Sequence, residues 1–282
     1  MGIWKRGSAL LLAALLVGVT AGCGKKVQVD KERVAVDESK GIHFSEDKQR
    51  LESYNPKIES KEYTPPTGIT AVGDRAFEKC SGLTNVTLPD GVTAIGERAF
   101  LNCTRLTTIA LPGSIETIGD YAFENCRDLS IAALPAGVTA IGKGIFKDCK
   151  KLTSVTLPAG VRTIGYQAFY NCESLTGVTL PAGVTLIEDS AFEECESLTS
   201  VTLPEQVTKL GANAFKKCTR LTNVNFPAGL TAIGPGAFEG CKRLDRVRIP
   251  KSVKAIGARA FKGCPCEKQV KSEYKELYNY DD

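Results

Sequence analysis

A single interval governs most of the chain, because cysteine, phenylalanine and proline each recur every 23 residues. The three series run from Cys80 to Cys264, from Phe77 to Phe261 and from Pro66 to Pro250. They share one phase and define eight complete repeats over residues 66–249, with a partial ninth that ends at Cys264. Repeats of this length are typical of solenoids, in which each repeat forms one coil and packs on its neighbours.

The repeat at residues 158–180 reads PAGVRTIGYQAFYNCESLTGVTL, and its apolar positions are neither helical nor alternating throughout. LTGVTL alternates at its end, which predicts a short strand that the next proline terminates, because proline lacks a ladder donor. Gly165 recurs in the other repeats except at Glu188 and predicts a turn. AFxxC predicts about one helical turn, often with an acid such as Asp120 or Asp189 ahead of it.

One repeat alone buries too few side chains to offset the entropy of ordering its backbone. Stacked repeats gain hydrogen bonds between parallel strands and bury both sides of each coil. We therefore predict a repeat solenoid over residues 66–264, mainly β with short helical or 3₁₀ turns, whose parallel strands lie on one face.

The pattern LxxVxLPxxVxxIGxxAFxxC resembles the treponemal, BspA-like class of bacterial leucine-rich-repeat proteins, over about two thirds of the chain. The resemblance implies a right-handed leucine-rich-repeat coil, and attachment to host proteins and to other bacteria. The chain departs from better-known leucine-rich repeats in having proline, not an asparagine ladder, after the strand.

Both ends of the solenoid are expected to carry caps. Residues 42–65 resemble the half-repeat that precedes the first unit in this class, and their alternation around a Glu-Asp pair suggests a hairpin. Residues 265–282 predict a short capping helix and tail, with one apolar helical face made by Val270, Tyr274, Leu277 and Tyr278. An incomplete cap would leave a strand edge open and favour a homo-oligomer through the solenoid ends.

The first residues are typical of an export signal. Lys5 and Arg6 form a short basic start, and the apolar run over residues 9–19 is too short to span a bilayer. Residues 1–22 are therefore predicted to be a signal peptide rather than part of the fold.

Small residues lead into Cys23, a pattern that resembles the lipobox of bacterial lipoproteins and implies lipid attachment at Cys23. That family usually has leucine where Thr20 stands, so ordinary cleavage after Ala21 remains an alternative. Residues 23–41 are polar and charged, and we predict that they form the lipid attachment and a solvated tether. The expected location is the bacterial cell envelope, as an exported lipoprotein on the outer surface or in the periplasm.

Eleven cysteines in an exported protein would ordinarily indicate a disulfide framework. The nine ladder cysteines face the inside of their coils, where cysteine packs as a small apolar residue, so we predict buried free thiols. Coils about 5 Å apart leave disulfides between neighbours open as an alternative. Any reactive thiol is expected at Cys264 or Cys266, near the end of the solenoid. A linear ladder does not converge on a metal ion.

Nothing in the sequence predicts an enzyme or a cofactor. His43 is the one histidine, and no cysteine, serine or acid is fixed beside it. The glycines recur as turns and form no phosphate-binding loop. The net charge of +4 is spread without a continuous basic stripe, which argues against nucleic acid as a partner.

The strand-bearing face is the predicted binding surface, because repeat proteins present variable side chains there. Two outward positions recur in each strand, and the predicted binding residues are Asn85, Thr87, Thr108, Ala110, Ile131, Ala133, Ser154, Thr156, Asn223, Asn225, Arg246 and Arg248. Ala110, Ile131 and Ala133 form an apolar spot among hydroxyls. The two arginines form a basic end that continues to Lys251 and Lys254. Threonine also simply suits exposed strands, so the hydroxyls alone do not predict a site.

These features favour a non-enzymatic protein–protein interaction module, a membrane-anchored surface adhesin that binds a host or bacterial protein. One alternative is a periplasmic structural or self-assembling envelope lipoprotein. A carrier of hydrophobic ligands is a third hypothesis, but it would need a cavity, and coils filled with phenylalanine and leucine leave little room for one.

Overall fold

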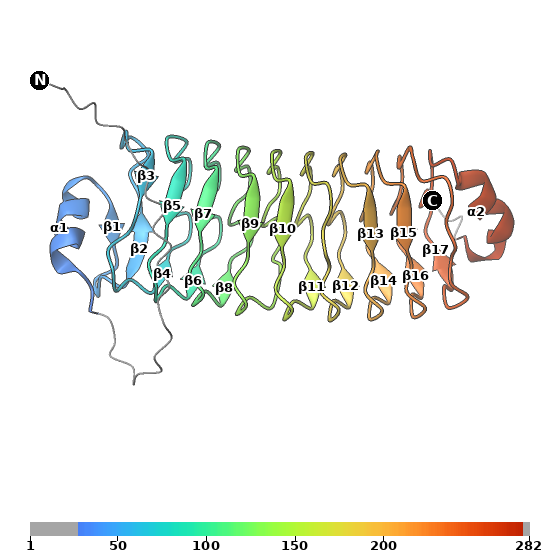
Figure 1. Cartoon of the computed structure of the whole chain (residues 1–282), viewed down its shortest axis with the longest axis horizontal. Helices are drawn as coiled ribbons and strands as arrows, with labels where there is room; N and C mark the ends of the chain where they lie inside the picture. Colours follow the sequence, from blue (N-terminus) through green and yellow to red (C-terminus); the bar gives the residue numbers. More distant parts are fainter. Residues whose placement is uncertain (1–27, 279–282) are drawn as a thin grey trace, which may run out of the picture.

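The structure is a computed structural model that describes residues 28–278, in which short coils stack along one long axis (Figure 1). The predicted signal peptide, the lipid attachment at Cys23 and the last four residues, 279–282, lie outside the described residues. The 23-residue repeat predicted from the sequence appears as the pairing interval, since Ser200 pairs with Asn223 and Val201 with Val224.

One row of parallel strands runs along the front of the solenoid, and we call its outward surface the strand face (Figure 1). The row consists of β3 (Glu62–Tyr63), β5 (Asn85–Thr87), β7 (Thr108–Ala110), β9 (Ile131–Ala133), β10 (Ser154–Thr156), β13 (Ser200–Thr202) and β15 (Asn223–Asn225). The middle residue of each longer strand points inward and the outer two point outward, as the alternation predicted. The predicted strands at 177–179 and 246–248 run in the same row without strand pairing.

The sequence did not predict a second row of parallel strands, which lies near the glycine turns (Figure 1). It consists of β4 (Ala71–Val72), β6 (Ala94–Ile95), β8 (Thr117–Ile118), β11 (Thr163–Ile164), β12 (Leu186–Ile187), β14 (Lys209–Leu210), β16 (Ala232–Ile233) and β17 (Ala255–Ile256). Each of these strands has only two residues, too few for an alternating pattern. The second row gives most coil interfaces another set of backbone hydrogen bonds. It is interrupted between β8 and β11, where Ile141 forms only an isolated bridge with Ile164.

The AFxxC stretch forms a turn that joins neighbouring coils, and not the expected helical turn. In the first repeat Arg75 and Lys79 are left-handed, with φ of 56° and 61°. Phe77 N–H donates to Ala99 O of the next coil at 2.7 Å, whereas Cys80 N–H donates to Phe77 O at 3.1 Å. A helical turn would direct these N–H groups within the coil, so the stacked neighbour changes the local conformation.

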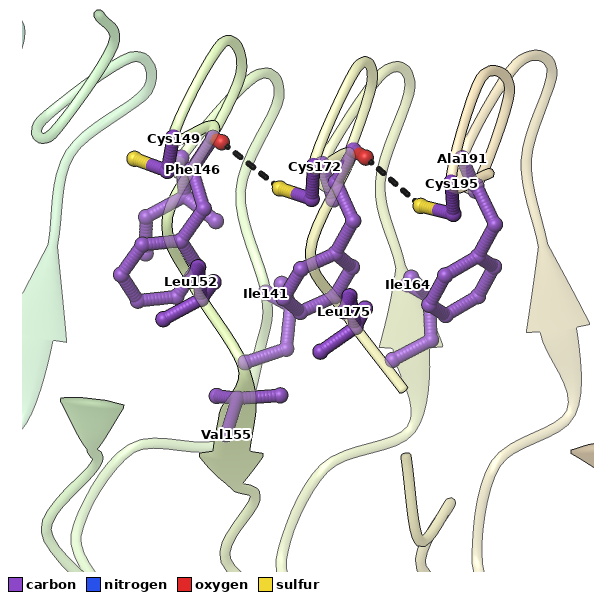
Figure 2. Packing of buried hydrophobic residues seen from close by; sticks show 14 of the residues in the cluster. Ile141, Phe146, Cys149, Leu152, Val155, Ile164, Cys172, Leu175, Ala191 and Cys195 are labelled. Carbon is purple, nitrogen blue, oxygen red and sulfur yellow. Dashed lines mark hydrogen bonds between the residues drawn. The ribbon is translucent and has the colours of Figure 1, made fainter. Parts of the chain in front are cut away.

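Phenylalanine and cysteine form two continuous ladders inside the coils (Figure 2). The rings of neighbouring coils stack, with centroids 4.8 to 5.6 Å apart from Phe77 to Phe261. Each Cys Sγ after the first faces the carbonyl oxygen of the phenylalanine in the preceding coil, as Cys172 does with Phe146. All ten described cysteines are buried free thiols, as we predicted for the ladder.

The amino-terminal end is covered by a hairpin and a helix. Strand β1 (His43–Phe44) pairs antiparallel with β2 (Arg50–Ser53), which pairs in turn with β4. The predicted tether is wrong in its second half, because Lys31–Ser39 forms helix α1. The side chain of Val34 is buried, and buried Asp37 accepts a hydrogen bond from Tyr63 Oη at 2.7 Å. These tertiary contacts hold a segment whose composition alone indicated solvation.

The carboxyl-terminal end is covered by α2 (Glu267–Glu273) and the short 3₁₀ helix Lys275–Leu277. Val270 is fully buried, and Gln269 Nε2 donates to Val247 O at 3.3 Å. Ile249 N–H donates to Tyr274 Oη at 3.4 Å. Side chains therefore take hydrogen-bonding positions that a further coil would occupy, and both ends of the described solenoid carry a cap.

Candidate interaction surface

The strand face presents the predicted binding residues to solvent. Ten of the twelve lie on β5, β7, β9, β10 and β15, and Arg246 and Arg248 follow in the same row one coil later. Eleven are exposed, and Asn85 is half-buried. The structure thus brings these side chains onto one continuous surface, but it does not gather them around a single point.

Threonine hydroxyls form hydrogen bonds between neighbouring coils at the start of this row of strands. Thr107 Oγ1 donates to Thr84 O at 2.9 Å, and Thr222 Oγ1 donates to Thr199 O at 3.1 Å. Similar bonds recur at Thr153, Thr176 and Thr199. Each hydroxyl reaches back one coil, so the backbone beneath the exposed side chains is held by bonds on both sides. A threonine that recurs just before β5, β7, β10, β13 and β15 was the sequence signal for this ladder.

Ile131 is the most exposed large hydrophobic side chain of the described residues, at 60%. Its neighbours Ala110 and Ala133 are also exposed, and Ile131 pairs in register with Ser154 of the next coil. The apolar spot predicted from the sequence is therefore a real feature of the surface. A branched apolar side chain on a paired strand can enter a pocket of a partner with little loss of conformational entropy.

Gly177 interrupts the strand face between Ser154 and Ser200. It has no side chain in the outward row, and no atom lies within 4 Å of where its Cβ would stand. Val178 beside it is half-buried, whereas Val155 and Val201 are buried. A shallow groove follows this gap along the strand face.

A second exposed apolar pair lies on the other strand row and was missed by the sequence analysis. Leu186 on β12 and Tyr166 in the preceding coil are 37% and 39% exposed. Glu188, the one departure from the glycine series, accepts a hydrogen bond from Tyr166 N–H through its carboxylate at 2.8 Å. That departure was the available signal that this coil differs from the others.

The ladder thiols are poorly suited to nucleophilic chemistry. Burial raises the pKa of Cys80 to about 12 and the pKa of Cys126 well above 9.0. A hydrogen bond with the Cys241 thiol, followed by burial, raises the pKa of Cys264 to about 12. Cys264 and Cys266 are both buried, so the expectation of a reactive thiol at this end was wrong.

Residues 28–278 include the one histidine of the chain. His43 is exposed on β1 and has no side-chain hydrogen bond or ion pair there. In that range no three His, Cys, Asp or Glu side chains are grouped to hold a metal ion. None of the helices within it has the length and hydropathy needed to cross a membrane.

The comparisons with known proteins agree with this architecture. The family described as "BspA type Leucine rich repeat region" matches this chain in six copies, over residues 52–176 and 139–268. The solved T. pallidum leucine-rich repeat protein TpLRR is 29% identical with a TM-score of 0.50, and the match covers 72% of this chain and 86% of that one. A leucine-rich repeat protein from Bacteroides ovatus is 27% identical with a TM-score of 0.53, covering 78% of this chain and 66% of that one.

No curated protein sequence matches the chain. Leucine-rich-repeat solenoids typically serve as non-enzymatic interaction scaffolds. The matched residues span most of the chain and include all of the strands from β3 to β17. The chain belongs to the BspA-type leucine-rich repeat family.

Proposed function

We propose that this chain is a non-enzymatic interaction module of the bacterial cell surface, an adhesin that holds a host or bacterial protein on its strand face. The observation that carries the proposal is the 60% exposure of Ile131 in the middle of an ordered polar surface. Protein interfaces commonly combine one buried apolar anchor with a surrounding polar rim. Ala110 and Ala133 enlarge the apolar spot, and hydroxyl side chains surround it.

Membrane attachment in this proposal depends on an acylated Cys23. The structure supports a short connection, because Asp30 N–H donates to Thr67 O of the first coil at 3.0 Å. Residues 23–29 can span at most roughly 25 Å when fully extended. The amino-terminal cap would then stay close to the membrane, while the strand face extends away from it.

A pair of matched substitutions tests the strand face as the binding surface. Ile131→Thr places on β9 the residue type found at the equivalent position of β7, Thr108. Leu186→Thr does the same on β12, since Thr163 and Thr117 are its counterparts. Both changes remove one exposed apolar side chain. Ile131→Thr should weaken binding of the purified chain to immobilised host plasma and matrix proteins by about tenfold.

Leu186→Thr should leave that binding within about twofold, because the second strand row is outside the proposed surface. Equal losses in the two variants would argue against a site on the strand face. Surface location needs a separate measurement, which is protease digestion of intact and of gently lysed cells with a periplasmic protein as control. Protection until lysis would favour a structural lipoprotein within the envelope.

A further inference from the structure

The end of the last complete repeat and the start of the partial ninth carry an unusual concentration of positive charge. Residues 242–254 contain six basic residues and one acid, which gives +5, whereas the whole chain carries +4. The rest of the chain therefore sums to −1. We call residues 242–254 the basic coil. Its basic residues are Lys242, Arg243, Arg246, Arg248, Lys251 and Lys254, and all six are exposed.

These charges lack the ion pairs that occupy basic residues elsewhere. The equivalent stretch at residues 150–162 contains three basic residues, but Lys150 pairs with Glu173 at 2.6 Å and Lys151 with Asp128 at 2.7 Å. No ion pair of the described residues involves the six cations of the basic coil. Unpaired like charges on one coil repel each other, and an anionic ligand would relieve that repulsion.

A groove of about 570 Å³ runs between the basic coil and the coil before it. Its lining includes Asn223, Asn225, Arg246, Arg248 and Gln269. The asparagine amides offer donors and an acceptor, and each guanidinium offers a planar fork of donors for a carboxylate or sulfate. One side of this open groove thus offers amides for hydroxyls, and the other side offers guanidinium groups for anions.

We infer that the basic coil binds an anionic polysaccharide, a sugar polymer that bears carboxylate or sulfate groups. This inference goes beyond the proposed function, because it assigns a second class of ligand to another part of the strand face. The polymer lies across the solenoid axis, with its anions on Arg246 and Arg248 and its hydroxyls on the asparagines of β15. Lysines at the two ends of the coil extend the positive field along the polymer.

Two other polyanions fit the groove less well. An extended acidic peptide would gain most by adding a strand, but Gln269 and Tyr274 already bond to backbone groups of this edge. Single-stranded nucleic acid gains affinity by stacking bases on aromatic rings, and the groove has no exposed ring, since Phe226 is buried.

The test uses the purified chain and three probes at equal charge: heparin, polygalacturonate and poly-glutamate, with neutral dextran as a blank. Arg246→Ser and Arg248→Thr are combined, because Ser154 with Thr156 and Ser200 with Thr202 occupy these positions in other coils. The control combines Arg105→Ser with Lys209→Ser, two exposed cations outside the basic coil that lose the same charge. Thermal unfolding of both variants should match the parent chain.

Binding to either anionic polysaccharide is expected, and raising salt from about 0.05 to 0.5 M should weaken it strongly. The arginine variant should lose roughly tenfold or more in affinity, and the control about twofold or less. Equal losses would mean that net charge alone attracts the polymer, and no binding to either polysaccharide would also overturn the inference. Poly-glutamate binding as tightly as heparin would assign the groove to acidic proteins instead. Any of these failures leaves the Ile131 test of the proposed function untouched.

Discussion

The Sγ atom of Cys172 lies 3.2 Å from the carbonyl oxygen of Phe146 in the preceding coil. The same carbonyl accepts a hydrogen bond from Cys149 N–H at 3.1 Å. The thiol therefore supplies a second donor to a buried acceptor and fills space beside the phenylalanine ladder (Figure 2). The sequence predicted only the second of these roles for the ladder cysteines. An alanine at this position would keep the turn but lose the donor.

Cys172→Ala is expected to lower the free energy of unfolding by about 1 to 3 kcal/mol. The loss combines one buried hydrogen bond with the small cavity left by the sulfur. Chemical denaturation followed by circular dichroism measures it. Thr179→Ala, an exposed change in the same repeat, serves as the control and should stay within about 0.5 kcal/mol. A Cys172→Ala curve that overlays the parent would show that the thiol contributes neither bond nor packing.

Alkaline pH should destabilise the fold before tyrosine ionises. An unfolded thiol has a pKa near 9.0, whereas burial raises the pKa of Cys80 to about 12. The folded-state pKa is raised, so this stabilisation is complete below pH 9.0 and is lost as the pH rises towards 12. Thermal melts between pH 9 and pH 10 should show a steady fall in melting temperature. This range lies below the ordinary tyrosine pKa of 10.0, so cysteine ionisation dominates it.

The Cys80→Ala variant isolates the contribution of one thiol to that fall. The free energy of unfolding of this variant should change less with pH than that of the parent chain. The two slopes should differ by at most about 1.4 kcal/mol per pH unit. The parent and the variant are compared at each pH, so the cost of the lost side chain itself cancels. Parallel curves would mean that the Cys80 thiol ionises equally in the folded and unfolded chains.

The repeat period and the alternation within LTGVTL predicted most of the solenoid. Buried Phe169 and Cys172, the outward side chains of β10 and the exposed Ile131 all follow from a spacing that local chemistry expresses in every copy. Such features can be predicted from the sequence because the pattern within one repeat determines which of its side chains point inward and which point outward. The apolar spot and the basic end were predicted for the same reason, as departures from a regular row.

The elements that the sequence analysis missed depend on contacts between distant residues. Helix α1 has one buried valine, and its buried Asp37 is satisfied by Tyr63, 26 residues further along the chain. The left-handed residue Arg75 donates its N–H to Glu97 O of the next coil. Neither contact leaves a local periodic pattern, so composition suggested a tether and a helical turn instead. The second strand row is missed similarly, because two-residue strands exist only through their neighbours.

The glycine series reflects close approach between coils, and Gly119 provides a sharp test. A Cβ at Gly119 would lie 2.5 Å from Glu97 N, a backbone atom that cannot move without disturbing the preceding coil. Gly119→Ala should therefore cost at least about 2 kcal/mol of stability. Gly113→Ala is the matched control, since no atom lies within 4 Å of its Cβ position. It should be neutral or slightly stabilising, because alanine restricts the unfolded chain. Similar denaturation midpoints for the two variants would contradict a steric origin of the glycine series.

The carboxyl-terminal cap should keep the described solenoid from associating end to end. Val270 anchors α2 and is fully buried, so Val270→Asp places an unpaired charge in the core and should detach the helix. The backbone groups of Val247 and Ile249 would then lose Gln269 and Tyr274, leaving an open parallel edge that can pair with another chain. Sedimentation velocity over a range of concentrations should show larger species for Val270→Asp. Lys268→Asp, an exposed change on the same helix, should sediment like the parent chain. If Val270→Asp sediments as the parent does while its melt shows a loosened cap, the edge itself does not drive association. In that case any self-assembly of the protein would have to use another surface.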